Sequence, residues 1–182
     1  MCKHYGGKAR VMRLGIAILR AVVGGFFVGH GLQKLKAREG TAGGFERMGL
    51  RPGKVHATAA AVAETGGGAL LAAGLATPLA AAALTGTMTV AIDTVHAAKG
   101  PWNTDGGYEY NAVLIAAVFA ITSEGPGALS LDRRQWGAGW AIAQLAAGVG
   151  GAAAMLRWAH SQEAQPEPER ASEPARETVS VN

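Results

Sequence analysis

The chain has little of what soluble enzymes use for chemistry. It contains one cysteine, Cys2, which excludes an internal disulfide and a CxxC redox pair. Only 16% of its residues are charged and 6% aromatic, so the apolar half consists mainly of Ala, Gly, Leu and Val. It has no phosphate-binding loop and no nucleophile elbow, and the glycines at 66–68 follow no strand, so they are not a dinucleotide fingerprint. The composition therefore favours a protein built from apolar helices.

Residues 14–36 form a long apolar stretch without an acidic residue. About 20 helical residues, rising about 1.5 Å each, cross a hydrocarbon layer about 30 Å thick. Arg20 and His30 lie inside this stretch, and lipid solvates neither a charge nor a bare backbone. The stretch therefore predicts a membrane-spanning helix that packs against other apolar helices, some of which carry acids. We expect its Gly25 and Gly29 at a close helix contact, and its Lys34 extended towards lipid headgroups.

Further apolar stretches follow, so we expect an all-α integral membrane bundle of five spanning helices. The later stretches cover residues 55–75, 79–99, 110–123 and 136–158. The one at 110–123 is short for a span and would require local thinning of the bilayer. Residues 37–54 form a polar connection, with an amphipathic turn near Phe45 at the membrane interface. A soluble bundle is disfavoured because the helices lack charged faces.

Both ends of the chain are polar. Residues 1–13 form a basic flank that contains Lys3, Lys8, Arg10 and Arg13. Residues 161–182 lack the apolar residues that offset ordering entropy, so we expect a disordered tail there. The formal net charge of +4 reflects these flanks and the loops, which anchor spans at headgroups, and we expect no nucleic-acid partner. Because Arg20 interrupts the apolar run, we expect no cleaved signal peptide.

Ionisable residues within the predicted helices are expected to meet. Glu64 lies near the middle of the second helix, and Asp93 lies one turn before His96 in the third. Antiparallel threading places His30 and His96 towards the same side, with Asp93 a little deeper and Glu64 close to mid-membrane. Arg20 lies in the opposite half, and Glu109 opens the fourth helix on the side of the histidines. The predicted buried polar cluster consists of Arg20, His30, Glu64, Asp93, His96 and Glu109.

Three interpretations of this cluster remain open. It is structural, with Arg20 in a buried ion pair with Glu64 or Asp93. It is a site for a small redox-active or lipid-like molecule such as a quinone, with histidine and glutamate handling protons. It is a proton or solute path through the bundle. No metal site is expected, because two histidines on separate helices are a weak ligand signal, and no residue is assigned a catalytic role.

Several short motifs occur in a characteristic order. They are RAVVGGFFVGHGLQKL, GGFERMGL-RPG, AETGGGALLAAGLATPLAAAALTGTM, VHAAKGPW, GGYEYNAVL and GPGALSLD. Over residues 14–132 this order resembles the DoxX family, small bacterial and archaeal integral membrane proteins with a four-helix core. Carried over by position, the recurrent residues of the family correspond to Arg20, His30, Gly31, Lys34, Glu64, His96, Gly107, Glu109, Gly125, Gly127 and Asp132.

The resemblance implies a four-helix core over residues 14–132, to which this chain adds a fifth helix at 133–160. The family takes its name from a small subunit of an archaeal quinone-linked oxidoreductase, and related proteins associate with membrane redox and thiol-stress complexes. We therefore expect a multi-pass protein of a bacterial plasma membrane, at most a subunit or anchor of a membrane oxidoreductase. Quinone is the candidate cofactor and a redox protein the candidate partner. A small transporter and a non-catalytic scaffold are the alternatives, and the lack of a cysteine pair argues against a self-contained thiol activity.

Overall fold

The computed structural model describes residues 3–163, and the side chains of residues 13–161. Every regular element in this part of the chain is a helix, which confirms the all-α prediction. The main helices are α1 (Lys3–Lys36), α2 (Arg38–Arg47), α3 (Gly53–Ala73), α4 (Thr77–Ala91), α5 (Glu109–Glu124) and α6 (Ala138–Glu163). Short segments join α4 to α5: a π-helical turn η1 (Ile92–His96) and the 3-10 turns η2 (Ala97–Lys99) and η3 (Asn103–Asp105).

The lengths of these helices suit a membrane bundle. Three segments are long and apolar enough to cross a membrane: Arg13–Lys36, Thr77–Lys99 and Ala138–Ser161. α3 has 21 residues and α5 has 16, so α5 is short for a span, as predicted. The three apolar helices support a membrane bundle, whereas the count of five spans stays a prediction.

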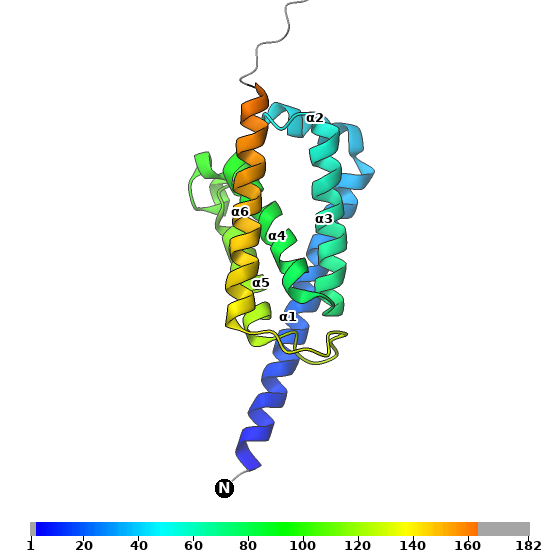
Figure 1. Ribbon diagram of the computed structural model, residues 1–182, viewed down its shortest axis with the longest axis vertical. Coiled ribbons are helices and arrows are strands. Elements are labelled where there is room, and N and C mark those ends of the chain that lie inside the picture. Colours follow the sequence, from blue (N-terminus) through cyan, green and yellow to red (C-terminus); the bar gives the residue numbers. More distant parts are fainter. Residues whose placement is uncertain (1–2, 164–182) are drawn as a thin grey trace, which may run out of the picture.

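The helices form a ring with one helix outside it. α1, α3, α4 and α5 pack in a cycle, and α6 lies outside against α4 and α5 (Figure 1). α2 lies across one end of the bundle, which we call the α2 end, and packs on α3. The loop formed by residues 125–137 crosses the opposite end, which we call the loop end, and the first turns of α1 project beyond it (Figure 1).

Close contact between α1 and α3 depends on glycines. A Cβ atom added at Gly24 would collide with the backbone of Gly68, and one added at Gly31 would collide with Thr65. Gly25 and Gly29, which the sequence predicts at the contact, have open space around them. The prediction chose the wrong glycines: Gly25 is exposed and Gly29 half-buried, whereas Gly24 and Gly31 are buried at the contact.

Several boundaries differ from the predicted ones. α1 begins at Lys3, so the backbone of the basic flank continues the first helix instead of preceding it. The polar connection contains a ten-residue helix, α2. The third predicted helix changes from α to π geometry at Ile92. Of the predicted tail, residues 161–163 complete α6, and residues 164–182 lie outside the described part of the chain.

Candidate functional site

A cavity of about 800 Å³ lies among the helices. Residues of all six main helices and of the π turn line it, and most of them are small or apolar. Ligand pockets in proteins typically measure about 300–1,000 Å³, with a few polar groups in a mainly apolar wall. By position, the lining residues divide into a part inside the four-helix ring and a part between α3 and α6.

We call the part inside the ring the inner chamber. Its lining consists of Phe27, His30, Lys34, Glu64, Met88, His96, Asn111 and Leu114. Less than 10% of the surface is exposed for Phe27, Glu64, Met88, Asn111 and Leu114. The chamber therefore combines a few polar side chains with an apolar wall that is shielded from solvent.

The polar centre of the inner chamber is an ion pair between α1 and α3. Lys34 Nζ donates a hydrogen bond to Glu64 Oε2 at 2.5 Å, and the two side chains are 27% and 4% exposed. The expectation that Lys34 extends to headgroups is therefore wrong. Its side chain reaches inward because a buried carboxylate requires a partner.

Two histidines on different elements line the same cavity as this ion pair. His96 ends the π turn, and its Nδ1 donates to the Gly106 carbonyl oxygen at 2.6 Å. A carbonyl only accepts, so Nδ1 carries the proton and Nε2 of the neutral ring is an acceptor. His30 is exposed and lies one turn before Lys34 on α1. The wider π turn beside the chamber is typical of local distortions near functional sites.

We call the part between α3 and α6 the outer groove. Its lining consists of Ala59, Ala60, Ala63, Leu79, Ala82, Ala83, Gly86, Ala147 and Gly151. α3 and α6 stand on either side of α4, which forms the floor (Figure 1). Towards the α2 end, the ring of His56 on α3 approaches that of Trp158 on α6, with 6.1 Å between centroids. The groove is open because small residues face it along its length.

Arg20 lies away from this cavity, at the loop end. It is 3% exposed, and its Nε donates to the Ala72 carbonyl oxygen at 3.0 Å. Its two amino groups donate to the carbonyl oxygens of Pro126, Ala128 and Leu129. Arg20 therefore satisfies backbone acceptors of α3 and of the loop, and its hydrogen bonds go to no carboxylate.

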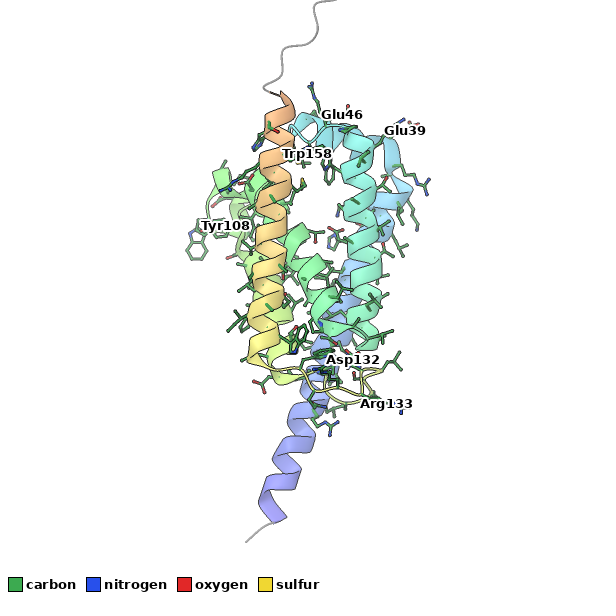
Figure 2. The ribbon with its side chains drawn as sticks, viewed as in Figure 1. Glu39, Glu46, Tyr108, Asp132, Arg133 and Trp158 are labelled. Carbon is green, nitrogen blue, oxygen red and sulfur yellow. The ribbon has the colours of Figure 1, made fainter. Side chains whose placement is uncertain are left out.

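Asp132 completes what we call the loop-end network, formed by Arg20, Thr77, Asp132 and Trp136. Asp132 accepts from the amide N–H groups of Ala76 and Thr77 at 2.9 and 3.0 Å, from the Thr77 hydroxyl at 2.8 Å and from the Trp136 indole at 2.9 Å. Burial raises the pKa of Asp132, but these hydrogen bonds outweigh burial and hold the pKa below its ordinary value. Figure 2 shows Asp132 at the loop end, opposite Trp158 at the α2 end.

The predicted polar cluster is divided among several places. Three of its members line the cavity: His30, Glu64 and His96. Arg20 belongs to the loop-end network, and Asp93 is exposed on the π turn. Glu109 accepts a hydrogen bond from the Asn103 amide at 2.9 Å and so fastens the loop before α5. An ion pair of Arg20 with Glu64 or Asp93 does not form, because Lys34 is the partner of Glu64.

Two buried polar residues of the cavity lining were not predicted from the sequence. His56 is 7% exposed and lies eight residues before Glu64, which places both on one face of α3. Asn111 is 6% exposed, and its Nδ2 donates to Met88 Sδ at 3.3 Å. Its spacing of three from Leu114 marks the inward face of α5. Helical spacing to known inward residues was the signal that could have identified both.

Metal coordination has little support in this arrangement. Among the side chains described, those of residues 13–161, no group of three or more His, Cys, Asp or Glu residues is placed to hold a metal ion.

One comparison with known proteins gives a match. The family model described as DoxX matches residues 15–97, which run from α1 to the end of the π turn. The matched region contains Arg20 and six residues of the inner chamber, Lys34 and Glu64 among them, but neither α5 nor α6. No curated protein and no solved structure matches the chain. The chain therefore contains a DoxX domain over residues 15–97, and its long apolar helices are compatible with a membrane helical bundle.

Proposed function

We propose that this protein is a membrane subunit or anchor of a redox complex and that its inner chamber binds the head group of a quinone. The observation that supports this most directly is the Lys34–Glu64 pair, which lies with His30 and His96 on the wall of a mainly apolar cavity of about 800 Å³. A few polar or charged side chains in the wall of a mainly apolar cavity are typical of ligand sites.

The residues of the inner chamber suit a quinone head group chemically. A quinone is a flat apolar ring with two carbonyl oxygens, so it requires hydrogen-bond donors within an apolar wall. Lys34 and Asn111 carry donors, and Phe27, Met88 and Leu114 supply apolar contact. Lys34 is 27% exposed and has a flexible stem, so its ammonium is able to contact both Glu64 and a ligand.

The remaining polar groups suit proton exchange. When a quinone is bound, its reduction consumes two electrons, which a redox partner protein supplies, and two protons. Glu64 accepts or releases a proton inside the chamber, with Lys34 balancing its charge. His30 lies on the wall of the same cavity, and its imidazole is the group proposed to pass protons to and from the chamber.

In this proposal the chain crosses a bacterial plasma membrane five times. Length and composition assign three of these spans, and α3 and α5 are the other two. Residues 14–132 act as the DoxX-like core, and the helix beyond them, α6, covers one side of α4.

The test is recovery of a bound quinone from full-length protein purified in mild detergent. We expect about one quinone per chain by mass spectrometry of the extract. The Glu64→Gln variant should retain no more than about a tenth of the quinone that the unaltered protein retains, because the charge that orients Lys34 is lost. Glu124→Gln, an exposed carboxylate at the loop end, is the matched control and should retain as much as the unaltered protein.

Protein that carries no quinone and binds none on titration would contradict the proposal. A continuous water path to Glu64, detected by labelling cysteines introduced along α4, would instead favour a transporter. Absence of both a ligand and a path would favour a scaffold.

A further inference from the structure

We propose that the outer groove between α3 and α6 holds the long apolar chain of the quinone and is the route by which the ligand enters from the bilayer. This inference rests on the proposed function of the inner chamber. It assigns ligand selection to α6, a helix outside the residues that match the family model.

The groove and the inner chamber are parts of one cavity, so a ligand can occupy both. The floor of the groove carries no charge along α4 from Leu79 to Val90, a length of about 16 Å at the helical rise. The charged residues and the histidines of the lining lie on the chamber side and towards the α2 end: His30, Lys34, His56, Glu64 and His96. A ligand with one polar head and one long apolar chain matches this distribution.

The groove opens towards an apolar environment. Leu79 of its lining is 69% exposed, and the lining residues Ala59 on α3 and Ala147 on α6 are also exposed. In a membrane bundle such side chains contact lipid, so the mouth between the two helices opens to hydrocarbon. A water-soluble ligand would have to cross that hydrocarbon, whereas a lipid-soluble ligand reaches the mouth by lateral diffusion.

The way in which α6 contacts α4 determines where the groove opens. Thr85 Oγ1 donates to Gln144 Oε1 at 3.2 Å, and a Cβ atom added at Gly148 would lie 2.7 Å from the Thr85 Cβ. α6 is therefore held tightly on α4 at this level. One turn further on, a Cβ atom at Gly151 would meet nothing within 4 Å, so the space beside α6 is open.

Gly151 allows a direct test with an internal control. Gly150 is also exposed and has open space at its Cβ position, but it does not line the cavity. Replacement of glycine by leucine raises the helix propensity by the same amount at either position. Gly151→Leu places a side chain in the groove, whereas Gly150→Leu places one beside it.

The experiment compares two probes on full-length protein in lipid nanodiscs: a benzoquinone with a decyl chain and one with only methyl substituents. We expect Gly151→Leu to weaken binding of the decyl compound by at least about tenfold and to leave binding of the methyl compound unchanged. Gly150→Leu should change neither affinity. Ala63→Leu, on the opposite wall of the groove, should reproduce the Gly151→Leu pattern and provides a second variant if the first does not fold.

Equal weakening of both compounds, or no effect on either, would overturn the groove inference and leave the proposed function standing. Failure of the unaltered protein to bind either compound would overturn the proposed function itself. A phospholipid that is recovered from the unaltered protein and lost in Gly151→Leu would show that the groove holds a membrane lipid and would overturn the assignment of a quinone chain.

Discussion

The loop end and the inner chamber both contain buried charged side chains, but they use them differently. At the loop end, Arg20 donates to four backbone carbonyls and Asp132 accepts four hydrogen bonds, so both are saturated by the fold. In the inner chamber, Lys34 and Glu64 hydrogen-bond to each other beside open volume. A network in which every group is hydrogen-bonded stabilises one arrangement of the chain. Charged groups beside a cavity are still able to form hydrogen bonds to a ligand.

This difference predicts the largest loss of stability at Arg20. Arg20→Met leaves the carbonyls of the loop and of Ala72 without a donor, and we expect unfolding to become easier by about 3–5 kcal/mol. Thermal unfolding in detergent measures this change. Arg13→Met, an exposed arginine of the same helix, should change stability by less than about 0.5 kcal/mol. Equal effects of the two variants would show that the network does not hold the loop.

Asp132→Asn should have the next largest effect, about 2 kcal/mol, because the charge-assisted acceptor for Thr77 and Trp136 is lost. The effect should also depend on pH. The folded pKa lies below the unfolded value, so the stabilisation by Asp132 is complete above pH about 4 and is lost as the pH falls through the folded pKa. Unfolding midpoints between pH 7 and 3 should therefore converge for the two proteins at the acid end. Parallel curves would refute this role of Asp132.

Glu64→Gln should affect stability less than either change at the loop end, by about 1 kcal/mol. The reason is that Lys34 is 27% exposed and can turn its ammonium towards water once the carboxylate is gone. The effect of Glu64→Gln on quinone retention should nevertheless be large. Unfolding and ligand content measured on the same preparation separate the two effects. A stability loss like that of Arg20→Met would mean that the chamber, too, is a structural network.

Asp93→Asn should have the smallest effect. Asp93 is exposed and does not line the cavity, although the sequence predicts it in the buried cluster. We expect stability to change by less than about 0.5 kcal/mol and quinone retention to stay the same. A marked loss of quinone retention would show that Asp93 contributes to the binding site.

Sequence patterns predicted the helices better than their contacts. Periodicity and apolar length identified every main helix except α2, because these are local properties of the chain. The same patterns chose Gly25 and Gly29 for the α1–α3 contact, where Gly24 and Gly31 pack instead. Helical spacing fixes which residues share a face but not which face meets a neighbour.

The sequence by itself determined an all-helical apolar bundle, the inward position of Glu64 and the resemblance to the DoxX family, since each depends on composition and residue order. Only the tertiary structure decided that Lys34 is the partner of Glu64, that Arg20 binds the loop backbone and that α6 leaves a groove beside α3. Partners of buried charges depend on the rotation and relative depth of packed helices. Those quantities result from close packing between distant segments, and no single stretch of sequence contains them.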